Sequence, residues 1–139
     1  MIVEIGDYAE CERKFDQKDL ELFADAIQDK YAAHKQSPTS GQSTFYRSDI
    51  VYGIFTSASF TSLFRLYFPK AIYMSQDLKF RKPILRDENV KARVEITGWD
   101  AAKKNVQFRT VILKQGESGQ EEVAVEGNAL LKIPYIEVK

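Results

Sequence analysis

The chain has 139 residues with 20 acidic and 20 basic side chains, so its net charge of zero excludes a global field that would steer it toward nucleic acid or an anionic membrane. Its length suits one domain covering residues 1–139, and its 44% hydrophobic and 29% charged content is typical of a soluble globular protein. The lone Cys11 rules out a disulfide framework, and no apolar run of a secretory signal is visible at the N-terminus. We therefore expect a cytoplasmic protein without membrane contact.

The N-terminal part predicts a strand followed by an amphipathic helix. Residues 8–15 have the character of a modest strand. Asp16 is placed to start a helix, with Asp19 three residues later as a negative partner in its first turn. One apolar stripe then recurs at helical spacing, formed by Leu20, Phe23, Ala24 and Ile27. We expect this helix to end near Gln28.

Residues 30–49 connect this helix to the next element without sustained periodicity, and they carry Ser, Thr, Gly and Pro at their centre. A structureless connection of this length is uncommon in a compact domain and is often functional when it occurs.

The stretch from Ile50 to Phe64 is nearly free of charge and shows almost no polar face. It is too short and too rich in hydroxyl groups for a membrane span, which needs about 20 apolar residues. We predict a central helix over about residues 50–68, buried on nearly every side. Asp49 is placed to cap its first turn, and Pro69 to end it.

After Pro69 the apolar pattern changes to a period of two, within residues 72–80, 90–96, 106–112 and 123–133. In the first run Gln76 interrupts the apolar face, as a satisfied buried amide would. Long sequential strands with one apolar side predict an antiparallel sheet. A sheet of this kind around one hydrophobic helix is the hot-dog fold, in the α+β class. Its first strand leaves an open edge, so we expect a homodimer or a heterodimer with a similar subunit.

Four segments match, in order, the motifs of a known family: QDKYAAH at 28–34, IVYGI at 50–54, YMSQDLKFRKP at 73–83 and RDENVKARVEI at 86–96. The chain thereby resembles the MaoC-like dehydratases, a family of (R)-specific enoyl-CoA hydratases. The family motifs are G-D-x-N-P-I-H, I-V-H-G-M, Y-L-x-Q-x-L-x-F-x-x-P and G-D-x-V. The resemblance implies a hydro-lyase that converts trans-2-enoyl thioesters and (3R)-hydroxyacyl thioesters into one another, on coenzyme A or acyl carrier protein.

The resemblance also implies the residues of the site. Asp29 and His34 stand five positions apart, as the family's acid–base pair does, and can share one water. The backbone N–H of Gly53 corresponds to the family's oxyanion donor at the start of the central helix. Tyr31, Tyr52 and Thr61 fall at positions expected to contact substrate. Since the chain has a single His, no set of side chains has metal-ligand spacing, and no metal or other cofactor is expected.

Several supporting positions depart from the family pattern. Tyr31–Ala32 replaces Asn–Pro, Tyr52 replaces His, Gln28 replaces Gly, and Gln36 replaces a common Asp. Because such groups orient a catalytic pair, the departures leave open an altered substrate, a slower enzyme, or a subunit that binds acyl thioesters without turnover.

Two further interpretations remain open. Asp49 and Gly53 fit the D-x-x-x-G spacing of hot-dog acyl-CoA thioesterases, although in these the pattern usually follows the first strand without a preceding helix. Each site residue also has a plain structural alternative. Asp29 suits a surface charge at a helix end, His34 an ordinary loop histidine, and Gly53 a small residue for close packing between helix and sheet.

Overall fold

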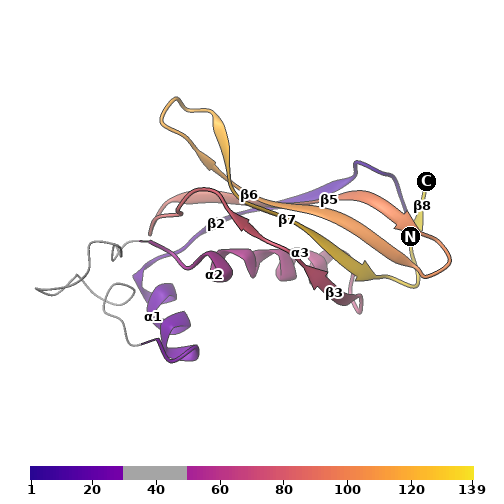
Figure 1. Cartoon of the computed structure of the whole chain (residues 1–139), viewed down its shortest axis with the longest axis horizontal. Helices are drawn as coiled ribbons and strands as arrows, with labels where there is room; N and C mark the ends of the chain where they lie inside the picture. The colour runs from indigo at the N-terminus through magenta and orange to yellow at the C-terminus, as the bar shows by residue number, and fades with distance from the viewer. Residues whose placement is uncertain (30–49) are drawn as a thin grey trace, which may run out of the picture.

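The structure, a computed structural model, describes residues 1–29 and 50–139, and its main part is an antiparallel sheet with a helix along one face (Figure 1). Its elements in chain order are β1 (Ile2–Val3), β2 (Tyr8–Lys14), α1 (Gln17–Ala26), α2 (Gly53–Ser57), α3 (Ser59–Tyr67), β3 (Ile72–Gln76), β4 (Lys79–Phe80), β5 (Asn89–Asp100), β6 (Asn105–Gln115), β7 (Glu121–Lys132) and β8 (Glu137–Val138).

The main sheet has the order β2-β5-β6-β7-β3, with neighbours antiparallel, and β4 also pairs with β7. Strands β5, β6 and β7 form its long centre, as their alternating sequences predicted. A short parallel pair of β1 and β8, which the sequence analysis did not foresee, brings the two ends of the chain together (Figure 1).

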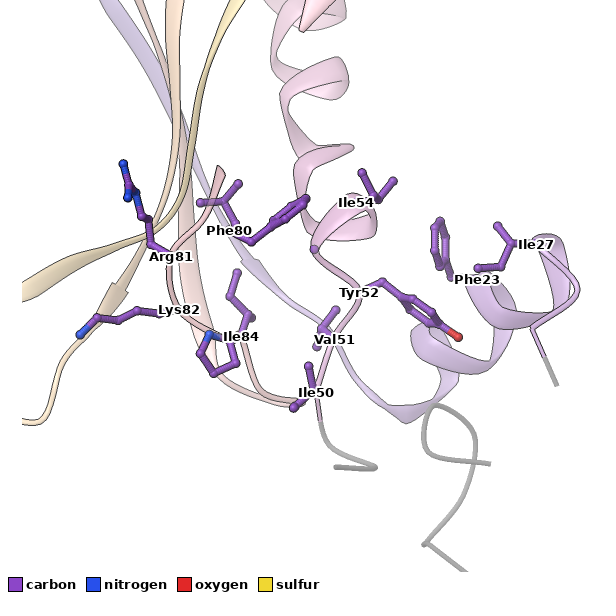
Figure 2. A pocket seen from close by; sticks show the side chains of 13 residues that line it. Phe23, Ile27, Ile50, Val51, Tyr52, Ile54, Phe80, Arg81, Lys82 and Ile84 are labelled. Carbon is purple, nitrogen blue, oxygen red and sulfur yellow. The ribbon is translucent and has the colours of Figure 1, made fainter. Parts of the chain in front are cut away.

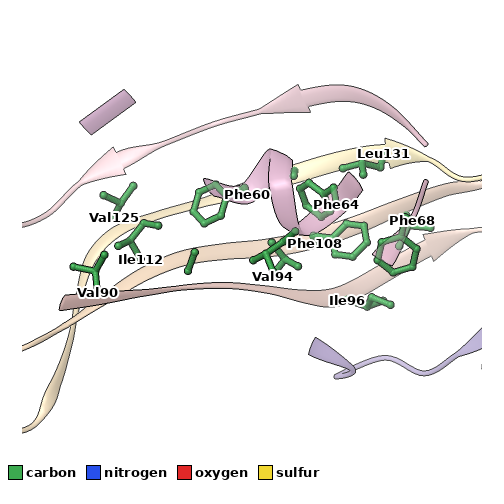
Figure 3. Packing of buried hydrophobic residues seen from close by; sticks show 14 of the residues in the cluster. Phe60, Phe64, Phe68, Val90, Val94, Ile96, Phe108, Ile112, Val125 and Leu131 are labelled. Atoms are coloured by element: carbon green, nitrogen blue, oxygen red, sulfur yellow. The ribbon is translucent and has the colours of Figure 1, made fainter. Parts of the chain in front are cut away.

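The central helix covers the inner face of this sheet. Ala58 has helical φ and ψ of −61° and −17° and joins α2 directly to α3, so the two helices follow one another. Aromatic side chains pack between the helix and the sheet, with ring centroids 4.8 Å apart for Phe64 and Phe108 and 5.6 Å apart for Phe68 and Phe108 (Figure 3). The α+β arrangement of a sheet around a central helix is therefore confirmed.

The prediction for α1 is confirmed at its start. The Asp16 side chain accepts a hydrogen bond from the Asp19 N–H at 2.9 Å, and the Asp19 side chain accepts one from the Asp16 N–H at 3.0 Å. Together they form a reciprocal capping box. The helix ends at Ala26, two residues earlier than predicted.

The predicted start of the central helix is wrong. The helix begins at Gly53, three residues later than predicted, with Tyr52 in the N-cap position. Asp49, which was predicted to cap it, lies outside the described residues. The reason is a contact distant in sequence: Val51 N–H donates to the Ile84 carbonyl at 2.8 Å. This hydrogen bond holds the residues before Gly53 extended.

The prediction that this helix is buried on nearly every side is also wrong. Ile54 is 60% exposed and Leu66 is 71% exposed, because the sheet of the same chain covers only one side of the helix. On the side of the helix that faces the sheet, Phe60, Leu63 and Phe64 are buried in the core.

The single strand predicted over 72–80 is divided into β3 and β4. The register shifts between Tyr73 and Ser75, and Ile72 and Met74 remain more than half exposed at the edge of the sheet. The Gln76 amide is satisfied as predicted, since it donates to Thr110 Oγ1 at 2.8 Å. No helix in the described part of the chain is long and apolar enough to cross a membrane.

Candidate active site

A mostly apolar hollow of about 470 Å³ lies at the start of α2 (Figure 2). Its walls come from the end of α1, from the segment leading into α2, and from β4 with the segment that follows it. The residues that line it include Phe23, Ile27, Tyr52, Gly53, Phe80 and Ile84. An apolar hollow with a few polar groups is the usual form of a small-molecule site.

The backbone at Gly53 is oriented by the helix it opens. The Tyr52 carbonyl accepts a hydrogen bond from the Thr56 N–H at 3.1 Å, so it points along the helix. Because a peptide unit is planar and trans, the N–H of Gly53 points the opposite way, out of the helix start. The first N–H groups of a helix have no partner within the helix. This N–H therefore suits an acceptor bound in the hollow.

Phe80 explains why residue 53 is a glycine. A Cβ atom at Gly53 would lie 2.6 Å from two ring carbons of Phe80, which is closer than real carbon contacts allow. The aromatic ring thus packs directly on the Gly53 backbone from β4 (Figure 2). Nothing in the sequence indicated this contact, because the two residues are 27 positions apart.

Asp29 lies where the chain turns back after α1. Gln28 has a positive φ of 60°, and the Asp29 N–H donates to the Ala24 carbonyl at 2.8 Å. This turn leaves the Asp29 carboxylate half-buried, and its Oδ2 accepts a hydrogen bond from the Tyr52 hydroxyl. Burial, and then the hydrogen bond to Asp29 and the negative charge there, raise the pKa of Tyr52 well above its ordinary value.

Aromatic packing holds α1 against the start of α2. The Phe23 ring lies 4.9 Å from the Tyr52 ring and stacks on Phe55 at 4.6 Å, while Phe15 lies 5.1 Å from Phe55. Of these residues, Phe23 stood out in the sequence as part of the apolar stripe of the first helix, and Tyr52 through the family resemblance, whereas Phe15 and Phe55 did not. The cluster fixes the two elements that supply Asp29 and Gly53.

Two basic side chains lie on the rim of the hollow. Arg81 pairs with Glu126 at 3.1 Å and Lys82 pairs with Glu122 at 3.0 Å, and each basic side chain is about half exposed. Exposed pairs of this kind contribute little to stability. Both residues thus lie at a solvated edge of the hollow.

The structure brings together three of the predicted site residues, Asp29, Tyr52 and Gly53. Thr61 lies apart from them on the exposed side of α3, where it lines another hollow together with Phe64 and Tyr73. The remaining predictions, for Tyr31, His34, Gln36 and Asp49, fall outside the described residues.

Solved structures define the class of protein. An (R)-hydratase from Aeromonas caviae, described as involved in PHA biosynthesis, has a TM-score of 0.82 at 28% identity and covers 95% of this chain and 98% of its own. A MaoC-like dehydratase from Rhodospirillum rubrum has a TM-score of 0.71 at 16% identity, with 93% and 91% covered. The fold is that of the hot-dog hydratases, as the sequence predicted.

The sequence comparison gives the family. No protein-family model matches the chain. An (R)-specific enoyl-CoA hydratase of Rhodospirillum rubrum is 31% identical over 131 residues, which span 93% of this chain and 87% of that protein. The chain therefore belongs to the family of (R)-specific enoyl-CoA hydratases, and it is an enzyme of this hydratase and dehydratase type.

Proposed function

We propose that this protein adds water reversibly to trans-2-enoyl thioesters and forms (3R)-hydroxyacyl thioesters. Asp29 and His34 serve as the acid–base pair, and the Gly53 N–H serves as the oxyanion donor. One observation supports this most strongly: the Asp29 carboxylate is held by Tyr52 next to the start of α2, beside an apolar hollow of about 470 Å³. Membership in a hydratase family supports the same chemistry.

The proposed reaction assigns a task to each group. The thioester carbonyl accepts a hydrogen bond from the Gly53 N–H, which is worth most when the carbonyl becomes enolate-like. Asp29 and His34 hold one water, remove a proton from it as its oxygen bonds to the β carbon, and deliver a proton to the α carbon. The apolar walls, including Phe80 and Ile84, accommodate the acyl chain.

We also propose that the enzyme acts as a dimer, either of two copies or with a similar subunit. The two edges of the main sheet are β2 and β3. Strand β2 carries the charged residues Glu10, Glu12 and Lys14 outward, whereas β3 exposes Ile72 and Met74. An exposed apolar edge strand favours pairing with another chain, so we place the contact at β3 rather than at the first strand.

The test is the loss of the conjugated enoyl absorbance of crotonyl-CoA when the protein is added. Asp29→Asn and His34→Gln are each expected to lower this rate at least about 10²-fold, since positioned acid–base groups supply about 10²- to 10⁴-fold. Glu21→Gln, a carboxylate change two turns earlier on α1, is the matched control and is expected to keep the wild-type rate. Thermal unfolding of each variant checks that the fold is retained.

Three results would contradict the proposal. Full activity of the Asp29→Asn, His34→Gln double variant would remove the acid–base assignment. Release of free coenzyme A thiol from acyl-CoA without hydration would favour the thioesterase interpretation with Asp49. Saturable binding of acyl-CoA without turnover of any enoyl thioester would favour a binding subunit instead of an enzyme.

A further inference from the structure

Tyr52 connects two parts of the proposed site that are far apart in sequence. Its backbone immediately precedes Gly53 at the start of α2, and its ring packs on Phe23 of α1 at 4.9 Å. Its hydroxyl donates to Oδ2 of Asp29, 23 positions earlier. The side chain of Tyr52 therefore links the Asp29 carboxylate to the backbone that leads into Gly53.

The end of α1 opposes a negative charge on the Asp29 carboxylate. The residue follows the C-terminal end of α1, where the helix dipole is negative, and Asp25 lies one turn earlier. Among the described residues, the other charged groups around the hollow are Arg81 and Lys82, and each is paired with a glutamate of β7. The Tyr52 hydroxyl donates to this carboxylate, and hydrogen bonds to a carboxylate favour its ionised form.

A tyrosine suits this task because it stays a neutral donor. Burial and the charge of Asp29 raise the pKa of Tyr52, so its hydroxyl keeps its proton through neutral and mildly alkaline pH. A histidine, the residue in the resembled family motif, titrates near neutral pH and would change its charge in the same range. Tyr52 thereby removes one titrating group from the site.

We propose that Tyr52 is a positioning residue that keeps the Asp29 carboxylate ionised and fixes its orientation toward the Gly53 amide. This rests on the proposed function, because it assigns Asp29 to the acid–base pair. It goes beyond that function by giving a role to a residue that departs from the family motif. Tyr52 acts through Asp29 rather than on the substrate.

The test uses Tyr52→Phe, which removes the hydroxyl and keeps the ring on Phe23. The acid limb of the kcat/KM profile for crotonyl-CoA is expected to move to higher pH, because the carboxylate loses a donor. On the plateau kcat is expected to fall about tenfold, the scale of one hydrogen bond to a charged group, while KM stays within about twofold. Tyr52→His restores a donor and is expected to recover part of kcat.

Tyr135→Phe is the matched control. It also removes a hydroxyl that donates a hydrogen bond, here to the Pro69 carbonyl at 2.7 Å, from a tyrosine whose pKa burial raises. Tyr135 does not line the hollow at α2, so the pH profile is expected to stay that of the wild type. An equal change in both variants would show a general effect of lost hydroxyl groups and would overturn the proposal.

A second measurement does not depend on activity. Carboxyl ¹³C resonances of labelled aspartates are followed through a pH titration, and Asp29 is assigned by its absence in Asp29→Asn. The titration midpoint of Asp29 is expected to rise in Tyr52→Phe, and an unchanged midpoint would overturn the proposal.

If the wild type hydrates no enoyl thioester but the midpoint rises, the proposed function fails while the role of Tyr52 in holding Asp29 stands. A Tyr52→Phe variant that raises KM without moving the acid limb would make Tyr52 a substrate contact and overturn the proposal.

Discussion

At the scale of single residues, the site depends on how closely side chains approach one backbone position. The Phe80 ring occupies the space next to Gly53 that a side chain there would need. Phe80 is itself 54% exposed, so its ring has room to move away from a larger neighbour. A substitution at Gly53 therefore changes the shape of the hollow more than it changes the fold.

Gly53→Ala is expected to lower kcat/KM for crotonyl-CoA about 10- to 100-fold, because the displaced ring moves into the space proposed for substrate. Thermal stability should change little, since the higher helix propensity of Ala, about 1 kcal/mol, offsets the cost of the contact. Steady-state kinetics and thermal unfolding measure the two effects. Adding Phe80→Ala should restore part of the lost rate relative to Phe80→Ala alone, and a Gly53→Ala enzyme with wild-type kinetics would contradict this account.

Tyr73 shows how burial of a neutral group makes stability depend on pH. Burial raises the pKa of Tyr73 to about 12, above the ordinary value of 10.0 that a tyrosine keeps in the unfolded chain. The folded state therefore favours the neutral phenol. Its contribution to the free energy of unfolding is complete below pH 10 and is lost as the pH rises from 10 to about 12.

Between pH 10 and pH 12 the free energy of unfolding is expected to fall less in Tyr73→Phe than in the wild type, because phenylalanine has no hydroxyl to ionise. At pH 8 the variant should be less stable by about 1 kcal/mol, because its hydrogen bond to Gln76 is gone. Urea denaturation at a series of pH values measures both quantities. Parallel pH dependence of the two proteins above pH 10 would show that Tyr73 does not carry this effect.

At the scale of elements, the end of α1 determines where Asp29 lies. Gln28 adopts a φ of 60°, in the left-handed region that glycine occupies at most helix ends of this kind. A side chain with a Cβ atom costs about 1–2 kcal/mol there. The family pattern has glycine at this position, so this chain keeps the turn with a less favourable residue.

Gln28→Gly is expected to stabilise the protein by about 0.5–1 kcal/mol, since relief of the left-handed strain exceeds the added entropy of glycine in the unfolded chain. The matched control is Glu21→Gly inside α1, which should destabilise by about 1 kcal/mol. Chemical denaturation measures both changes. A loss of stability in Gln28→Gly as large as in the control would show that the turn does not depend on this φ angle.

The elements themselves were largely predictable from sequence. In β5, Val90, Val94 and Ile96 alternate with charged residues, and this pattern survives because one face of the strand meets the core. The start of α2 was not predictable, since it depends on a hydrogen bond between Val51 and Ile84 across 33 positions. Local patterns specify which residues prefer a helix, but tertiary contacts decide where it begins.

The same limit applies to the candidate site. The resemblance to the family motifs was enough to propose Asp29 and Gly53, because these residues match the motif positions of the family's acid and oxyanion donor. The hydrogen bond from Tyr52 to Asp29 and the position of Phe80 required the fold, since each joins segments that are distant in sequence. The resemblance thus supplied the groups proposed to react, whereas the side chains that contact them appeared only in three dimensions.

At the scale of the whole molecule, apolar surface remains uncovered in the single chain. Ile72 and Met74 on β3 and Ile54 and Leu66 on the central helix are each more than half exposed. Patches of this kind mark interaction sites in many proteins. Because β3 is also an edge strand, a second chain can cover its side chains and satisfy its backbone at once.

Met74→Glu is expected to shift the protein from dimer to monomer, because a charge at the proposed contact must lose its hydration when the edges meet. Sedimentation velocity at several protein concentrations measures the change. Ile5→Glu, at a residue that is likewise about half exposed but lies outside β3, is the matched control and should leave the dimer intact. A wild type that is monomeric at all concentrations, or a Met74→Glu protein that stays dimeric, would contradict the proposed contact at β3.

The most direct measurement of the central claim is the configuration of the product formed from crotonyl-CoA. If Asp29 and its partner add water from one side of an enoyl chain held in the hollow beside Gly53, the product is (3R)-3-hydroxybutyryl-CoA alone. A dehydrogenase specific for the (3R) product should then consume it fully, a dehydrogenase specific for the (3S) product should consume none, and Asp29→Asn should form almost none of either. A (3S) or mixed product, or the same (3R) product at an unchanged rate from Asp29→Asn, would contradict the account.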